Sequence, residues 1–378
     1  MGNGRRVLGA AAAGAVLASL ALAAPAHAAG PAACKPAIRV LKALPGADPA
    51  EPSPWIEDNQ VNGIGPLGLA VGVSHGKPAY WLGTTVFPVP LPAGYTGGRV
   101  EAVNRWGLMA GTLTGPGGSR AFAYRPWMPA VTLLPGGEQA ADVNDKGRIV
   151  GQRHQPGVGA IGVEWSGGAV RRELALPPGF RLEGVTGIND AGQIVGHGDG
   201  PSPDPEDPYG ISPGLLWPAE AGSLPTQLKP LGGNYESYRP EAVDSAGRVV
   251  GVFWNSRAMV DHATRWTPPY EDAHSVAHLA GRTSGSFEDI SPTTNVSVGT
   301  ASDSLYEYPP DEPPPVQAQY WPGSGPMKAL PRLAPTGFSA AFTVTDKDQV
   351  GGVAVDAGGT ERPVIWTCAA AQAYLPAP

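Results

Sequence analysis

The chain reads Ile188-Asn189-Asp190-Ala191-Gly192-Gln193-Ile194-Val195-Gly196 near its middle, and this stretch is the clearest copy of a phrase that occurs seven times. The phrase consists of an aliphatic residue, a polar turn and a hydrophobic run that ends in glycine. Its other copies are Ile64–Gly72, Val103–Gly111, Val143–Gly151, Val243–Gly251, Ser291–Gly299 and Val344–Gly352. The closing glycines are roughly 40 to 55 residues apart, a spacing typical of propellers and solenoids. The repeat therefore indicates the architecture, although it says little about activity.

Residues 181–230 show how one repeat is expected to fold. Alternating apolar residues predict strands over 182–188 and 193–197, and the turn Asn189–Gly192 joins them. Two further strands are expected over 215–217 and 227–231. Four short antiparallel strands at this spacing make one small sheet. We therefore predict an all-β fold, a seven-bladed β-propeller of four-stranded antiparallel blades.

An aromatic residue follows each closing glycine, in the expected third strand of the repeat. The seven aromatics are Trp81, Tyr124, Trp165, Trp217, Trp266, Trp321 and Trp366. Because an aromatic ring can cover the bare backbone of a glycine on a paired strand, we expect each ring to pack on the glycine of its own repeat. The regularity of the pattern favours core packing over ligand stacking.

The two ends of the array complement each other. The first six repeats have a fourth strand after the aromatic, but the seventh has none, while an extra strand is expected over 39–45. The N-terminal strand is therefore predicted to pair in the last blade and close the propeller. Cys34 and Cys368 flank these two segments, and a disulfide between them is expected in an exported protein. Two unpaired thiols and a metal pair are the alternatives.

The first 28 residues have the features of an export signal. Arg5 and Arg6 precede an apolar, alanine-rich stretch that ends at Pro25, and Ala26-His27-Ala28 fits a cleavage site. A membrane anchor and the twin-arginine export route are alternatives. We predict a signal peptide over 1–28, one propeller domain over 34–368 and a tail over 369–378. The mature protein is expected to be secreted, monomeric and without a membrane span.

The net charge of the chain argues against one class of binding partner. The formal net charge is −7 at pH 7, and removing the signal would take away two arginines and no acidic residue. A nucleic-acid-binding protein needs a basic face, so this class is not expected.

The repeats resemble the HAF-type extracellular repeat family. The resemblance rests on the phrase Ile188–Gly196, on the following segments Leu134-Pro135-Gly136-Gly137 and Leu231-Gly232-Gly233, and on Arg120-Ala121-Phe122 in place of the triplet that names the family. It extends over roughly residues 38–367. It implies an exported, β-propeller-like protein, and it supplies no catalytic residues that could be transferred to this chain.

Insertions point to one face of the propeller as the candidate binding surface. In a four-stranded blade, the loop between the second and third strands and the connection to the next blade lie on the same face, and the long segments 198–213, 234–239 and 302–316 all fall there. The candidate ligand-binding residues are Asp199, Asp204, Asp207, Tyr209, Tyr235, Tyr238, Arg239, Tyr306, Tyr308 and Asp311. Such a surface suits a cationic ligand, a sugar or calcium, and solvated loops without a ligand are the alternative.

No catalytic residue, resident metal or other cofactor is predicted, although a bound calcium ion is an open alternative. The pattern Gly210-Ile211-Ser212-Pro213-Gly214 matches a nucleophile elbow, but it precedes an expected strand where a helix is required. We expect a secreted binding or interaction module, not an enzyme, whose extracellular ligand is a glycan or a protein. A polysaccharide hydrolase or lyase with carboxylates on the long-loop face is the alternative, and a purely structural envelope protein is a third hypothesis.

Overall fold

The computed structural model describes residues 34–46, 59–201, 211–229, 236–255, 258–303, 316–335 and 337–375. The predicted signal peptide lies outside these residues. The chain divides into two compact units, Met1–Cys34 and Lys35–Pro378, and every described strand belongs to the second. Apart from the strands, the described residues contain the short 3-10 turns Pro66–Gly68 and Ala369–Ala371. The all-β prediction is confirmed.

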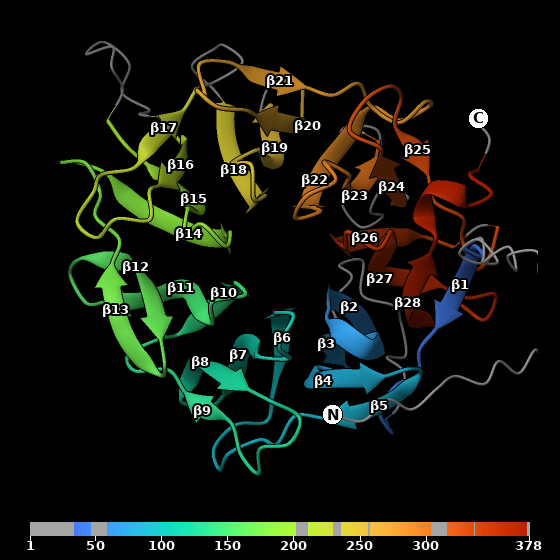
Figure 1. The fold of residues 1–378 in the computed structure, drawn as a ribbon, viewed down its shortest axis with the longest axis horizontal. Helices are drawn as coiled ribbons and strands as arrows, with labels where there is room; N and C mark the ends of the chain where they lie inside the picture. Colours follow the sequence, from blue (N-terminus) through green and yellow to red (C-terminus); the bar gives the residue numbers. More distant parts are fainter. Residues whose placement is uncertain are drawn as a thin grey trace, which may run out of the picture. The chain divides into compact units, whose positions relative to one another are not determined.

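Four-stranded antiparallel sheets make up this unit (Figure 1). Apart from the last sheet, which includes the N-terminal strand, the strands follow one another along the chain as four-stranded meanders, as one repeat predicts. The first two are β2 (Asn59–Ile64), β3 (Leu69–Ser74), β4 (Lys77–Leu82) and β5 (Thr85–Pro88), followed by β6 (Gly97–Val103), β7 (Met109–Gly115), β8 (Gly118–Tyr124) and β9 (Thr132–Leu133).

The middle of the chain forms an eight-stranded sheet made of two such meanders. They are β10 (Gln139–Val143), β11 (Arg148–Gln155), β12 (Gly159–Ser166) and β13 (Ala169–Glu173), then β14 (Arg181–Ile188), β15 (Ile194–Asp199), β16 (Gly214–Trp217) and β17 (Thr226–Leu228). A single residue pair, Ala160 with Leu182, joins the two meanders. The four strands predicted over 181–230 are therefore confirmed.

The remaining sheets complete the unit. One contains β18 (Glu236–Val243), β19 (Val249–Asn255), β20 (Val260–Trp266) and β21 (Ala273–Ser275), and the next contains β22 (Ser284–Ile290), β23 (Ser297–Ser302), β24 (Gln317–Trp321) and β25 (Lys328–Ala329). The last contains β26 (Ser339–Val344), β27 (Gln349–Val355), β28 (Glu361–Thr367) and the N-terminal strand β1 (Ala37–Val40).

The N-terminal strand pairs with the last strand of the chain, as predicted. In Figure 1 the blue β1 lies beside the red β28, and their antiparallel register places Ile38 opposite Trp366. Leu41 and Leu44 follow β1 and are buried in one cluster with Trp81 of the first sheet and Ile365 of the last. Neither cysteine is free, because Cys34 and Cys368 are disulfide-bonded, so the predicted disulfide is confirmed.

A β-bulge explains the closing glycine of the repeat. The first two strands of every sheet shift register by one residue, so that an extra residue of the first strand is left unpaired, for example Glu101 between Val100 and Ala102. The bulge turns a backbone carbonyl of the first strand toward the closing glycine. A Cβ atom at the seven glycines would lie only 2.0 to 2.3 Å from that oxygen. No side chain fits at this position.

The aromatic residues do not lie directly opposite the closing glycines. Each aromatic pairs with the residue two positions before the closing glycine, as Trp165 does with Ile149, and the bulged carbonyl is the atom nearest the glycine. The rings are almost fully buried, and they pack between neighbouring sheets. The core prediction holds, because the hydrophobic clusters each join side chains of adjacent sheets.

The Asn-Asp turn of the repeat links one sheet to the next. The side-chain oxygen of Asn144 accepts hydrogen bonds from the backbone of its own turn, while its Nδ2 donates to the carbonyl of Asn189 in the following turn at 2.9 Å. Asn104 and Asn189 make the same bond to their successors. The residue after the asparagine makes a second link between turns, because Oδ1 of Asp190 accepts a hydrogen bond from the backbone N–H of Asp145 at 2.8 Å.

Candidate functional site

A polar pocket of about 400 Å³ lies where the β14–β17 meander meets the β18–β21 sheet. We call it the rim pocket. It is lined by Glu183, His197, Ser212, Ser237, Tyr238, Arg239, Val252, Trp254 and Asp261. These residues come from the starts of first and third strands and the ends of second strands. The pocket therefore opens on the face to which the sequence assigned the candidate binding surface.

Three of the ten sequence-predicted site residues are described, and all three belong to this neighbourhood. Tyr238 and Arg239 line the pocket, and Asp199 accepts a hydrogen bond from the lining residue Ser212 at 2.7 Å. The other seven lie outside the described residues: Asp204, Asp207, Tyr209, Tyr235, Tyr306, Tyr308 and Asp311.

A second bulge in β14 builds one wall of the pocket. The register between β14 and β15 shifts between Leu182 and Gly184, which leaves Glu183 as the extra residue and sets Gly184 opposite His197. A Cβ atom at Gly184 would lie 2.8 Å from the imidazole, so the glycine leaves room for the His197 ring beside the strand. Nε2 of His197 is 3.8 Å from a carboxylate oxygen of Glu183.

The His197 imidazole is uncharged at neutral pH. Its pKa is lowered to about 4, first by burial and then by the positive charge of Arg239, while Asp199 opposes both effects. Its buried Nδ1 has no hydrogen-bond partner among the described residues. Burial also raises the pKa of Glu183, and the charge of the neighbouring Asp199 adds to this effect. Among the described residues, the pocket therefore contains a neutral imidazole beside a carboxyl group whose pKa is raised.

The opposite wall carries a guanidinium among carboxylates. Arg239 is paired with Glu241, the bulged residue of β18, and this carboxylate is the main reason that the pKa of Arg239 is raised. Burial raises the pKa of Asp261 to about 6, although Arg239 opposes the shift. The pocket lining thus offers one cation, two carboxyl groups and two serine hydroxyls.

Aromatic rings border the polar groups. The Tyr238 ring stacks on Phe253 with centroids 5.1 Å apart and an angle of 14° between the planes, and Trp254 follows directly in β19 and is partly exposed in the pocket. A ring next to hydroxyls and carboxylates suits a ligand that has both C–H faces and polar groups.

Four residues that line the pocket and could contact a ligand were not predicted from the sequence. Glu183, His197, Trp254 and Asp261 lie at strand ends, where polar residues are common, and no motif singles them out. The one available signal was the double glycine pattern of β14, in which Gly184 and Gly187 interrupt a strand and indicate bulges.

Neither a metal centre nor a membrane helix is found in the described part of the chain. There, no three histidine, cysteine, aspartate or glutamate side chains gather in a way that could hold a metal ion. Within the same residues, no helix has the length and apolar character needed to cross a bilayer.

Comparisons with known proteins identify the fold. No family model matches the chain, and no curated protein matches its sequence. Among solved structures, the β-propeller domain of the Trilobed protease from Pyrococcus furiosus, which has an open velcro topology, matches with a TM-score of 0.53 and 9% identity over 82% of this chain and 94% of that chain. Oligogalacturonate lyase from Vibrio parahaemolyticus matches with a TM-score of 0.51 and 12% identity over 88% and 98% of the two chains. At such identities the likeness shows the fold alone, a β-propeller.

Proposed function

We propose that the protein is an exported, seven-bladed β-propeller of the HAF-type repeat family that binds an extracellular glycan in the rim pocket. The proposal has three parts, namely the closed ring, the export and the ligand.

Contacts between sheets support a closed ring. Each sheet contacts the next along the chain, and β2 of the first sheet also contacts β26, β27 and β28 of the last. Four tryptophans of third strands donate their indole N–H to a carbonyl just after the outer strand of the preceding four-stranded meander, as Trp165 does to Pro135 at 3.0 Å. Trp81 donates to Lys42 at 2.7 Å, and Lys42 follows β1 in the same way. The bond from Trp81 to Lys42 therefore repeats, between the last sheet and the first, the contact that the four tryptophans make, and this supports closure.

The disulfide supports export. Disulfides form and persist in oxidising compartments, and this bond joins a cysteine that follows the predicted signal to one that follows the last strand. Cleavage after Ala28 would leave both cysteines in the mature protein.

The composition of the rim pocket supports a neutral or amine-bearing glycan. Sugar hydroxyls both donate and accept hydrogen bonds, and here carboxylates, serine hydroxyls, an arginine and a neutral histidine share one cavity. The carboxylates outnumber the single cation, so an anionic ligand would be repelled. The polar lining of the pocket is the observation that carries the proposal, because polar groups gathered in one cavity can exchange hydrogen bonds with a ligand that both donates and accepts.

Titration calorimetry on the mature protein tests which ligand binds in the rim pocket. Neutral, amine-bearing and uronate oligosaccharides are compared with and without calcium, using His197→Gln and, as a matched control, His154→Gln, which replaces an exposed histidine of β11. We expect binding of a neutral or amine-bearing glycan, weakened roughly tenfold by His197→Gln and unchanged by His154→Gln. Binding of uronates alone, or equal affinity in both variants, would refute the proposal.

A polysaccharide hydrolase or lyase is the second candidate. One observation favours it: Glu183, whose pKa is raised, lies beside a neutral His197 and near Asp199, a combination that general acid–base chemistry uses. The same oligosaccharides are therefore examined for cleavage after incubation. Cleavage that is lost in Glu183→Gln would favour the enzyme over the binding module.

A further inference from the structure

A second pocket, of about 430 Å³, lies beside the C-terminal segment and far along the chain from the rim pocket. We call it the C-terminal pocket. Its walls come from the connection between β21 and β22, from β24 and β25, and from residues 374–375. The backbone N–H of Leu375 donates to the carbonyl of Ala329 in β25 at 3.1 Å, so the end of the chain adds an edge to this sheet.

The charged residues that line this pocket are all cations, namely Arg282, Lys328 and Arg332. Arg282 forms an ion pair with Asp303 at 2.6 Å. Arg332 donates to the side-chain amide oxygen of Gln317 and to the carbonyl of Pro335, and no acidic side chain of the described residues pairs with it. Burial lowers the pKa of Arg332, and the like charge of Arg282 lowers it further. Two guanidinium groups therefore line this pocket, and among the described acidic side chains Asp303 pairs with Arg282 and none pairs with Arg332.

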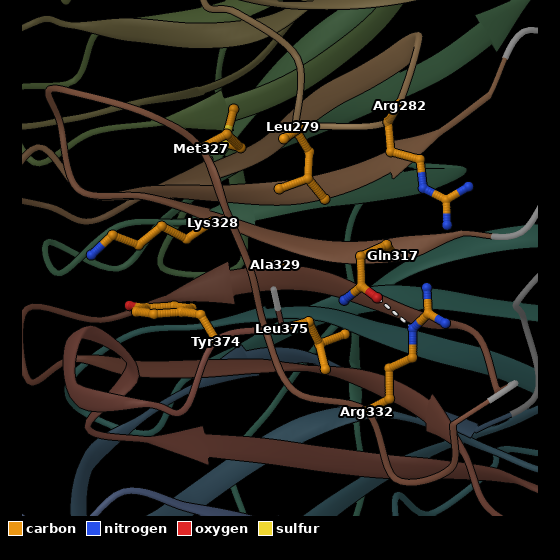
Figure 2. A pocket seen from close by; sticks show the side chains of 10 residues that line it. Leu279, Arg282, Gln317, Met327, Lys328, Ala329, Arg332, Tyr374 and Leu375 are labelled. Atoms are coloured by element: carbon orange, nitrogen blue, oxygen red, sulfur yellow. Dashed lines mark hydrogen bonds between the residues drawn. The ribbon is translucent and has the colours of Figure 1, made fainter. Parts of the chain in front are cut away.

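Apolar side chains separate the two arginines from the third cation. Figure 2 shows Arg282, Arg332 and the Gln317 amide at one end, Lys328 and Tyr374 at the other, and Leu279, Met327 and Leu375 between them. Leu279 and Met327 are each only 7% exposed. Nζ of Lys328 lies 4.6 Å from the centroid of the Tyr374 ring, and this cation–π contact stabilises the ammonium group.

We propose that the C-terminal pocket binds an amphipathic carboxylate, with its carboxylate on Arg282 and Arg332 and its apolar body on Leu279, Met327 and Leu375. Guanidinium groups bind carboxylates through paired, charge-assisted hydrogen bonds, and a carboxylate would neutralise the excess positive charge. An apolar chain would exclude water from the floor of the pocket. This site is independent of the rim pocket, whose charge has the opposite sign.

Calorimetry with matched amphiphiles tests the charge requirement. Decanoate, decanol and decylamine carry the same apolar chain with a negative, neutral or positive end, and inorganic phosphate tests an anion without a chain. The full mature protein is expected to bind decanoate at least tenfold more tightly than decanol and to bind neither decylamine nor phosphate measurably. Equal binding of decanoate and decanol, or no binding of decanoate, would overturn the proposal.

Variants locate the bound molecule. Arg332→Gln is expected to weaken decanoate binding about tenfold and leave decanol binding unchanged, while Arg120→Gln, which replaces an exposed arginine of β8, is the control. If Arg332→Gln unfolds, Leu375→Ser takes its place and is expected to weaken both amphiphiles. Decanoate binding unchanged in the folded variant would place the ligand elsewhere and overturn the assignment.

Discussion

Replacing Gly111 with alanine is the most direct test of the bulge that recurs in every sheet. The new Cβ atom would lie 2.2 Å from the carbonyl oxygen of Arg99, 2.8 Å from Cα of Val100 and 2.9 Å from the Phe122 ring. Ordinary contact distances are near 3.5 Å, so β6 and β7 would have to separate by about 1 Å.

The expected loss of stability follows from the packing and the hydrogen bonds that this separation disrupts. Overpacking alone destabilises a protein by about 1–3 kcal/mol. Each backbone hydrogen bond lost beside the bulge removes about 1 kcal/mol more. We expect Gly111→Ala to lower the free energy of unfolding by about 3 kcal/mol or more, which corresponds to a thermal midpoint roughly 5 °C lower.

Gly117→Ala is the matched control, because Gly117 lies in the turn of the same hairpin and a Cβ atom there would meet nothing within 4 Å. This variant should stay within about 0.5 kcal/mol of the original protein or become slightly more stable. Circular dichroism and tryptophan fluorescence follow unfolding of the three proteins side by side. If both variants melt together with the original protein, the bulged carbonyl does not exclude a side chain and the explanation of the closing glycine is wrong.

Three further predictions concern the links between sheets, the disulfide and the rim pocket. Asn144→Ala removes two hydrogen bonds within its turn and one to the next sheet, so urea titration should show a loss of about 3 kcal/mol, whereas Lys146→Ala in the same turn should change little. Reducing the bond between Cys34 and Cys368 should lower stability by about 2–5 kcal/mol, measured as a drop in the thermal midpoint with dithiothreitol. The pKa of His197 is lowered to about 4, so the unfolded chain binds a proton more readily than the folded one, and this histidine removes stability as the pH falls from about 6.5 toward 4.

Each of these three has a clear contrary outcome. Equal stability of the two turn variants would show that the asparagine ladder does not hold the sheets together. An unchanged midpoint in reductant, with both thiols shown to be free, would remove the stabilising role of the disulfide. An NMR titration that places the His197 pKa near 6.5 would contradict its burial, and His197→Gln would then leave the acid sensitivity of the protein unchanged.

Much of the fold could be predicted because its signals are local. Alternating apolar residues and Asn-Asp turns act over a few neighbours, so the four strands over 181–230 and the pairing of β1 with β28 followed from the pattern. The role of the closing glycine could not be predicted, since a bulge changes the register by one residue without a fixed sequence requirement. Each ring also lies diagonally to its glycine and not directly opposite it.

Only part of the rim pocket could be predicted from the sequence. The loop lengths pointed to its face and to Asp199, Tyr238 and Arg239, because long loops are visible in one repeat at a time. The imidazole of His197 and the carboxylate of Asp261 come from strand ends in different sheets, and they line one cavity only because those sheets pack together.

The sequence alone thus determined that strands form, where they turn and which ends of the chain meet, because hydrophobic alternation and turn chemistry are properties of adjacent residues. The tertiary structure decided which polar groups share a cavity and which protonation state each one holds. Burial and neighbouring charge arise only when separate sheets come together, and they depend on distances that no stretch of the chain encodes by itself.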